Sequence, residues 1–372
     1  MKYAVCIPTY NRPELLGIAV ESLQKDTTNL GFPIFVSSDS SPEYRTKEVE
    51  NLKALCNRGP SKIYYTDTER SEAYKRELQK SSGLSREVID IAMNGGSAGA
   101  NRNRLLLLAC TYGADGVIFS DDDMEVENDF IEYHIMALGN TVSQFLSKLG
   151  KKAIKVELSS KLNSADLDRI IEVFSAGWED CCYKKNIYLY KKLFRKSEYL
   201  FESIESDAAN LSLTNSVYST IPFPLHCFCE DYDFGYHAKI LLKSVDGIIL
   251  KGRYPISIHK NAVSRETDST DFLNRYLINI SEDVVKNLSV SNEKDFGCVM
   301  IKTIGKKIQN FVQSSELQKD RIMDSAKKLL QSSELQKKNI YRIGILYQNW
   351  TELTDATKKI DPSILEELLV TK

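Results

Sequence analysis

The stretch of sequence that decides the fold is GVIFSDDDM, residues 116–124. Its first half is a short apolar run with β-branched residues, which predicts a buried strand. Asp121, Asp122 and Asp123 follow at once, and three carboxylates so close together must share a counter-charge. A divalent metal is the simplest one, and oxygen ligands suit Mg2+ or Mn2+ carrying a diphosphate. For this stretch taken alone, a solvated turn after an edge strand is the alternative.

Two more strands with polar ends precede this stretch. The apolar run Tyr3–Ile7 stops at PTYNRP, residues 8–13, and the apolar run at 33–36 stops at a polar segment that includes Asp39. Between them, apolar residues at helical spacing from Leu15 to Leu23 predict an amphipathic helix that packs on a sheet. This is a βαβ opening, and in an open α/β sheet a ligand crevice is expected at the carboxyl ends of the strands.

The chain between these strands and the Asp cluster is less regular. Residues 47–56 are expected to form a second helix and residues 62–65 a third strand. The charged segment 66–86 has no clear apolar stripe and is expected to run over the surface as an insertion. A glycine-rich turn at 93–104 then feeds a helix, whose start could hold a phosphate or a ribose edge through backbone N–H groups and arginines. The turn lacks the GxGxxG pattern, so a plain turn is the alternative.

Four motifs in one order resemble the nucleotide-sugar-binding half of family 2 glycosyltransferases of the GT-A type. They are residues 8–12, Asp39, residues 96–103 ahead of a helix, and residues 120–123. The resemblance implies an α/β GT-A fold that is Rossmann-like, with a mixed central sheet flanked by helices. It also implies a nucleotide-sugar site and a metal site. The nucleotide-sugar residues are Pro8, Thr9, Tyr10, Arg12, Asp39, Asn94, Ser97, Arg102, Asp121 and Asp122, and the Mn2+ or Mg2+ ligands are Asp123 and Asp121.

An acidic motif in the second half resembles the Glu-Asp-x-Asp signature of the same family. It lies at residues 230–233 and opens a segment with helical spacing. Carboxylates in the first turn of a helix are favoured by the helix dipole, so a capped helix start is the alternative. An inverting transfer needs a base that takes the proton from the acceptor hydroxyl. Asp231 is the expected base, and Glu230 is expected to hold the acceptor or the base.

A histidine further along the chain is the third candidate metal ligand. Some GT-A enzymes bind the metal through a His in this part of the chain, which implies that role for His259; a polar strand end is the alternative. His237 stands where the family often has Arg or Lys, which weakens the case for a diphosphate contact at that position. The other elements expected in the second half are strands at 208–215, 246–250 and 254–258, helices at 129–138, 141–149 and 165–174, and a strand or helix at 152–158.

The character of the sequence changes to helical near its C-terminal third. From Asp271 onward Gly and Pro are few, and the heptapeptide QSSELQK occurs at 313–319 and again at 331–337, about five helical turns later. Such a repeat suggests a helical hairpin or a partner-binding surface, and a solvated helical appendage packed on the catalytic domain is the alternative. The stripe Ile343, Ile345, Leu346 and Trp350 would be the buried face of that appendage.

The domain boundaries follow from these patterns. A GT-A catalytic domain is expected over 1–265, with a nucleotide-sugar-binding half (1–125) and an acceptor-binding half (126–265). The helical C-terminal region spans 266–372. This region is also the candidate for peripheral membrane contact, through basic residues such as Lys302, and for homo-oligomer formation.

Composition excludes some classes of partner and compartment. The formal net charge of −2 leaves no whole-molecule field for nucleic acid. No run of about 18 apolar residues and no leader pattern occurs, so the expected location is the cytoplasm, with the inner face of the membrane as an option. The cysteines lack paired CxxC spacing and are expected to be reduced thiols.

These observations together predict a metal-dependent glycosyltransferase (a hexosyltransferase). It would move a hexose or N-acetylhexosamine from a nucleotide sugar, with UDP favoured, to a hydroxyl of a glycan, lipid-linked or protein acceptor, with inversion. One alternative is a nucleotidyltransferase, which would be expected to carry a Gly-rich, basic loop after its first strand where this chain has residues 8–11. The other is a non-catalytic scaffold of the same fold that binds glycans or partners.

Overall fold

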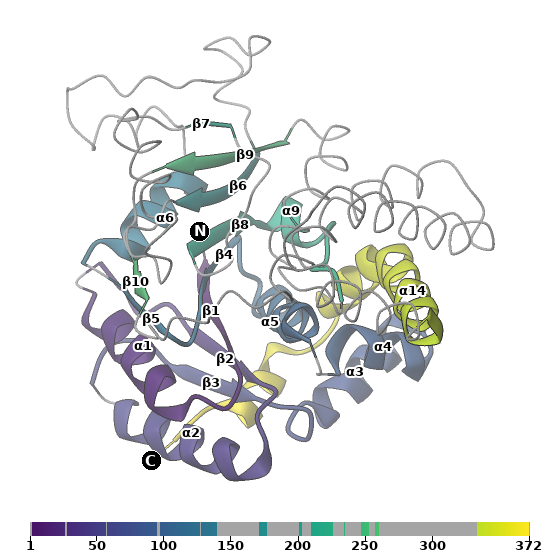
Figure 1. Cartoon of the computed structure of the whole chain (residues 1–372), viewed down its shortest axis with the longest axis horizontal. Coiled ribbons are helices and arrows are strands. Elements are labelled where there is room, and N and C mark those ends of the chain that lie inside the picture. Colours follow the sequence, from purple (N-terminus) through teal and green to yellow (C-terminus); the bar gives the residue numbers. More distant parts are fainter. Residues whose placement is uncertain are drawn as a thin grey trace, which may run out of the picture.

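The computed structural model describes residues 2–26, 28–56, 58–94, 97–126, 128–139, 171–176, 201–202, 210–225, 234, 247–252, 257–259 and 333–371. Within these ranges a mixed sheet with the strand order β3-β2-β1-β4-β8-β6-β9-β7 forms the centre of the fold (Figure 1). Its strands are β1 (Tyr3–Thr9), β2 (Ile34–Ser38), β3 (Ile63–Thr66), β4 (Gly116–Ser120), β6 (Ile171–Ala176), β7 (Phe201–Glu202), β8 (Asn210–Thr214) and β9 (Gly247–Gly252). A separate pair joins β5 (Met124–Val126) to β10 (Ser257–His259).

Strand direction divides the sheet into two parts. The strands β3, β2, β1 and β4 are all parallel, so their carboxyl ends lie at one edge. β8 then runs antiparallel to β4 and to β6, while β9 is parallel to β6 and antiparallel to β7. This confirms the predicted mixed α/β sheet, and its parallel part contains all three strands on which the sequence argument was built.

Helices cover both faces of the parallel strands, and these strands are accordingly apolar on both sides. Along β1, Val5 and Ile7 face a core with Leu16 and Val20, whereas the alternate residue Cys6 faces the core on the α5 side. The helices are α1 (Pro13–Lys25), α2 (Pro42–Leu55), α3 (Glu72–Ser82), α4 (Arg86–Met93), α5 (Ala98–Tyr112), α6 (Phe130–Gly139), α9 (Asn215–Tyr218), α14 (Ser333–Thr357) and the 3-10 helix η3 (Pro362–Leu368).

The segment 66–86 was expected to run over the surface, and that expectation was wrong. It contains α3, where Tyr74 and Leu78, one helical turn apart, are buried. The hydroxyl of Tyr74 donates to the carbonyl of Leu107 at 2.9 Å. The helix α14, from the far end of the chain, packs against α3.

The predicted helix at 165–174 was also wrong where the structure describes it. Residues 171–176 form β6, which pairs with β8 on one side and with β9 on the other. Ile171 and Val173 are β-branched and two residues apart, a strand pattern that a helical reading of the longer window obscured. The strands expected near 208–215, 246–250 and 254–258 are confirmed as β8, β9 and β10. The elements expected at 141–149 and 152–158 lie outside the described residues.

The described part of the C-terminal region packs onto the helical layer beside α3, α4 and α5 (Figure 1). Leu346 and Trp350 of α14 are fully buried, and the indole N–H of Trp350 donates to the carbonyl of Tyr218 at 2.9 Å. After η3 the chain reaches the edge strand β3, where the N–H of Val370 donates to the carbonyl of Ile63. The first copy of the heptapeptide repeat and Lys302 lie outside the described residues.

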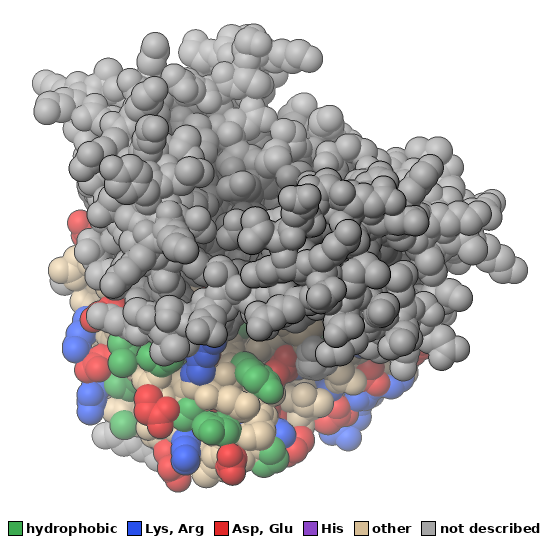
Figure 2. Space-filling model, in the orientation of Figure 1, with side chains coloured by type: hydrophobic (Ala, Val, Ile, Leu, Met, Phe, Trp, Pro, Cys, Tyr) green, Lys and Arg blue, Asp and Glu red, His purple; other side chains and the backbone are tan. Residues whose placement is uncertain are grey.

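The surface that the structure describes carries charges of both signs. Figure 2 shows acidic and basic side chains interspersed over the coloured part of one face, in keeping with the balanced composition. Among the helices that the structure describes, none combines the length and the apolar character that crossing a membrane requires.

A buried histidine joins α6 to the centre of the sheet. The ring nitrogens of His134 lie 2.9 Å from the hydroxyl of Ser212 and 2.9 Å from the side-chain oxygen of Asn210, both on β8. Burial lowers the pKa of His134 to about 3, because the charged imidazolium loses its hydration there, while the bond to Asn210 opposes this shift. The histidine is therefore neutral in the folded protein at neutral pH.

This shift predicts a pH dependence of the free energy of unfolding. Between about pH 6.5 and pH 3 the imidazole of His134 binds a proton in the unfolded state but stays neutral in the folded state. The stabilisation is complete above pH 6.5 and falls by up to about 1.4 kcal/mol per pH unit below it. Urea unfolding at a series of pH values should show a shallower acid slope for His134→Gln than for the wild type, and equal slopes would contradict the assignment.

Candidate functional site

The candidate site lies where the parallel strands end. After β1 the chain adds β2 and β3 on one side of that strand, and it then crosses to add β4 on the other side. Because the strand order reverses between β1 and β4, a crevice is expected at their carboxyl ends. Thr9 ends β1 in register with Ser38, which ends β2, and Ser120 ends β4. Side chains that follow these three strands are thus brought together although they lie far apart in sequence.

Asp122 connects the end of β4 to the end of β1. Its Oδ2 accepts from the Thr9 hydroxyl at 2.8 Å and from the Tyr10 N–H at 3.3 Å, and its Oδ1 accepts from Arg12 at 3.2 Å. Burial raises the pKa of Asp122 to about 7, outweighing Arg12 and Thr9, which favour the ionised form. Both oxygens of this carboxylate are therefore engaged by groups of the chain itself.

Arg12 is the counter-charge of two aspartates at once. Its Nη1 lies 3.2 Å from Asp122 Oδ1 and 2.7 Å from Asp123 Oδ2. Burial disfavours the guanidinium charge, but the two carboxylates outweigh it and raise the pKa of Arg12. The counter-charge that was expected for the acidic run is thus supplied, for these two aspartates, by an arginine.

Asp121, the most exposed member of the acidic run, pairs with a different arginine. Arg102 Nη2 donates to Asp121 Oδ1 at 2.8 Å, and its guanidinium lies 5.7 Å from the ring centre of Phe223. The Arg102 side chain is 5% exposed, whereas that of Asp121 is 31% exposed. The pair therefore presents a carboxylate edge to solvent above a buried cation.

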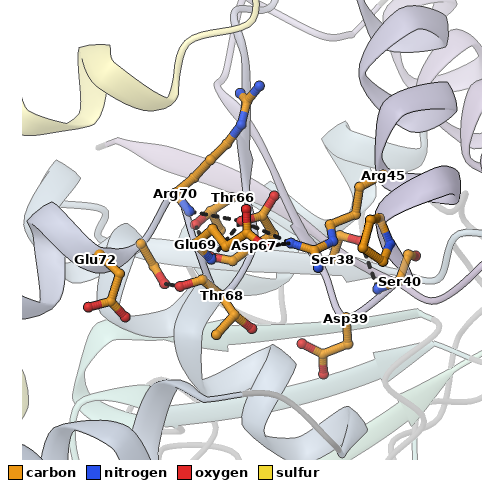
Figure 3. A network of polar contacts seen from close by, with 12 residues as sticks. Ser38, Asp39, Ser40, Arg45, Thr66, Asp67, Thr68, Glu69, Arg70 and Glu72 are labelled. Atoms are coloured by element: carbon orange, nitrogen blue, oxygen red, sulfur yellow. Dashed lines mark hydrogen bonds and ion pairs between the residues drawn. The ribbon is translucent and has the colours of Figure 1, made fainter.

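A third arginine, Arg104, holds the end of β2. Its Nη2 lies 3.1 Å from Asp39 Oδ1, and its side chain is completely buried. Sequence reasoning counted Arg104 among the arginines that could hold a phosphate or a ribose edge, but the structure buries it and pairs it with Asp39, which lies 65 residues away in sequence. Figure 3 shows the Asp39 carboxylate pointing away from the polar network around Asp67 at the end of β3.

Hydrogen bonds of Asn11 hold the loops after β1 and β2 together. Asn11 adopts a φ of 55°, in the left-handed region that Asn tolerates better than most residues. In this conformation its N–H donates to Ser40 Oγ at 2.6 Å, and its side-chain oxygen accepts from the Ser41 N–H at 2.9 Å. Ser40 is held in turn by the buried carboxylate of Glu48. The two loops therefore form one wall of the site.

Four other candidates occupy described positions. Pro8 is half-buried within β1, and Tyr10 is 63% exposed beside the acidic run. Ser97 caps α5, since its hydroxyl accepts from the Ala100 N–H at 3.1 Å. The side-chain oxygen of Asn94 accepts from Lys75, which is buried against α4. Asn94 and Ser97 thus have structural contacts, and their nucleotide-sugar role stays a prediction.

The remaining candidates belong to the second half of the chain. His259 ends β10 at the register position opposite Met124, the residue after Asp123. Glu230 and Asp231 lie outside the described residues. Phe234, three positions after Asp231, is buried, and its ring stacks on Phe223 with the ring centres 4.4 Å apart.

The donor atoms at this edge fit a divalent cation held together with a substrate. No group of three or more His, Cys, Asp or Glu side chains is arranged for a metal ion among the residues that the structure describes. Mg2+ and similar ions are commonly bound by one or two carboxylates plus substrate phosphates, rather than by a cage of protein ligands. Asp121 and Asp123 offer carboxylate oxygens of that kind, each now facing an arginine.

The proteins similar to the chain were found among solved structures. No family model and no curated protein matches the chain. Among solved structures, the chain is similar to a mannosyltransferase from Pyrobaculum calidifontis in complex with GDP-Man and Mn2+ (9% identity, 94% of this chain and 86% of that chain covered, TM-score 0.48). It is also similar to glucosyl-3-phosphoglycerate synthase from Mycobacterium tuberculosis (11%, 78% and 81%, 0.42) and to S. aureus TarS 1-349 (15%, 94% and 91%, 0.39). At these identities and TM-scores, the function proposed below rests on the chain's own residues.

The geometry of Asp122 predicts a large structural effect of its removal. Asp122→Ala should lower the free energy of unfolding by roughly 2 to 4 kcal/mol, because it strips a nearly buried partner from Arg12 and Thr9. Asp90→Ala, which breaks a partly exposed helix ion pair with Arg86, is the control and should cost about 1 kcal/mol or less. Equal losses in chemical denaturation would show that Asp122 does not connect the two strand ends.

Proposed function

We propose that the chain is a metal-dependent glycosyltransferase of the GT-A type, with its catalytic domain over 1–265 and a helical region over 266–372. The observation that carries the proposal is the convergence of Thr9, Asp39 and the acidic run at one edge of the parallel strands. A nucleotide sugar has a base, a ribose, a diphosphate and a sugar in a row. The polar ends of β1 and β2 suit the nucleoside, and the neighbouring end of β4, with its aspartates and arginines, suits the diphosphate.

The charges at this edge suit a diphosphate donor. A cation bound by Asp123 and Asp121 would neutralise the diphosphate as it departs. Arg12 and Arg102 lie at the same edge and, among the described residues there, could add hydrogen bonds to phosphate oxygens. Thr9 and Asp39 are proposed to hold the nucleoside end, and UDP is the nucleotide that we favour.

The transfer step needs a group that accepts a proton. The acceptor hydroxyl oxygen attacks the anomeric carbon, the bond from that carbon to the diphosphate breaks with its electron pair, and the hydroxyl proton passes to a base. Asp231 is proposed as this base and Glu230 as its partner, which gives inversion. The contacts of Phe234, three positions after Asp231 in sequence, support the assignment. The ring of Phe234 stacks on that of Phe223, and the guanidinium of Arg102 lies over the Phe223 ring.

The acceptor is proposed to be a hydroxyl of a glycan, a lipid-linked sugar or a protein, and the transferred sugar a hexose or N-acetylhexosamine. His259 is proposed as a further metal ligand, on the basis of its register position beside the acidic run.

Two substitutions should separate donor activation from transfer. Asp123→Ala is expected to lower metal-dependent hydrolysis of the donor sugar at least about 100-fold, because the diphosphate loses its cation. Asp231→Ala should keep nucleoside diphosphate binding and lose transfer by a similar factor. Hydrolysis is measured across UDP-, GDP- and dTDP-sugars by release of the nucleoside diphosphate.

The control is Asp355→Ala, which removes an exposed carboxylate of α14 that pairs with Lys358 at 2.7 Å and should leave hydrolysis unchanged. Failure of every donor sugar with the wild-type chain would sink the glycosyltransferase proposal. Full transfer activity in Asp231→Ala would remove Asp231 as the base while leaving the donor site standing.

A further inference from the structure

Glu48 of α2 places a completely buried carboxylate behind the ends of β2 and β3. Three hydroxyl groups donate to it. Its Oε2 accepts from Ser38 Oγ at 2.7 Å and from the Tyr65 hydroxyl at 2.8 Å, and its Oε1 accepts from Ser40 Oγ. A buried carboxylate is stable only if polar partners replace its lost hydration, and these hydroxyls do so.

The Glu48 carboxylate sets the direction of all three hydrogen bonds, because a carboxylate can only accept. Burial, with the nearby Glu48 as a further cause, raises the pKa of Tyr65, so this hydroxyl keeps its proton and donates. Ser38 and Ser40 likewise direct their protons to Glu48, which leaves their oxygens to accept. Figure 3 shows these two serines beside each other, and Ser38 Oγ accepts from the Ser40 N–H at 3.1 Å.

The second serine carries this orientation to the loop after β1. Ser40 Oγ accepts from the N–H of Asn11 at 2.6 Å, and Asn11 holds a left-handed φ of 55°. Its two neighbours in sequence both contact the acidic run. The N–H of Tyr10 donates to Asp122 at 3.3 Å, and Arg12 pairs with Asp122 at 3.2 Å. The bond between Asn11 and Ser40 therefore fixes the backbone between two residues of the candidate site.

We propose that Glu48 is a positioning residue for the donor site. By orienting the Ser40 hydroxyl to accept from Asn11, it holds the loop after β1 in the conformation that brings Tyr10 and Arg12 to the acidic run. The proposal rests on the proposed function, in which Thr9 and Arg12 contact the donor. It adds to the site a residue of α2 that acts through Ser40 and Asn11.

The first variant is Glu48→Gln, which keeps the size of the side chain but replaces one acceptor oxygen with a donor group. Because Oε2 receives two hydroxyls and Oε1 one, the amide should turn its NH2 group toward Ser40. There it competes with the Asn11 N–H for the Ser40 oxygen. Hydrogen–deuterium exchange of the full chain should then rise about fivefold in peptides that cover residues 8–14. The dissociation constant of UDP at a fixed Mn2+ concentration, measured by calorimetry, should rise by a similar factor.

The control removes a different partner of the same carboxylate. Tyr65→Phe deletes one hydroxyl that donates to Glu48 but leaves the bonds of Ser40 in place. It should leave exchange at residues 8–14 and the UDP dissociation constant within about twofold of wild type. A purely structural role of Glu48 in the core would not separate the two variants.

Two substitutions of Ser40 keep the test decisive if Glu48→Gln does not fold, as judged by circular dichroism. Ser40→Ala removes the acceptor of the Asn11 N–H and should reproduce both changes expected of Glu48→Gln. Ser40→Thr keeps the hydroxyl and should stay close to wild type in both measurements.

Failure of the positioning role differs from failure of the proposed function. A wild-type chain that binds none of UDP, GDP and dTDP in the presence of Mn2+ contradicts the proposed function and removes the donor-site role of Glu48 with it. If the wild type binds UDP, unchanged exchange and affinity in folded Glu48→Gln or in Ser40→Ala overturn the role of Glu48 alone. Equal changes in Tyr65→Phe would overturn it as well.

Discussion

Pairing between carboxylates and arginines at the carboxyl edge of the sheet is the interaction on which the rest of the site depends. Asp39, Asp121, Asp122 and Asp123 lie at the ends of two parallel strands, and like charges this close repel one another strongly when water is excluded. Arg12, Arg102 and Arg104 each contact at least one of these carboxylates. The arginines come from the β1 loop and from α5, so the charge balance also fixes how α5 and the strand-end loops sit on the sheet.

This balance gives the three neighbouring aspartates different parts. Asp122 is enclosed by Thr9, Tyr10 and Arg12 and ties two strand ends together. Asp121 keeps an edge toward solvent. Asp123 is buried and shares Arg12 with Asp122. A cation and a diphosphate that enter this edge would exchange partners with the ion pairs that Arg12 and Arg102 now make with Asp123 and Asp121.

Sequence reasoning found the parts of the fold that depend on local patterns of residues. Apolar runs with polar ends located β1, β2 and β4, and their parallel pairing brought Thr9, Asp39 and the acidic run together as expected. The parts that it missed depend on distant partners. The burial of α3 needs α14, and the role of Arg104 needs Asp39, which no spacing rule connects. β6 was misread because two β-branched residues were read within a longer window of helical spacing.

The acidic edge is proposed to bind a divalent cation together with a nucleoside diphosphate. Electron paramagnetic resonance of Mn2+ tests it directly, because protein-bound Mn2+ loses the sharp signal of the free ion. Titration of Mn2+ into the full chain should show weak binding alone, at least about tenfold tighter binding when UDP is present, and loss of that enhancement in Asp123→Ala. Mn2+ binding that is indifferent to UDP, or an enhancement that survives Asp123→Ala, would contradict the account.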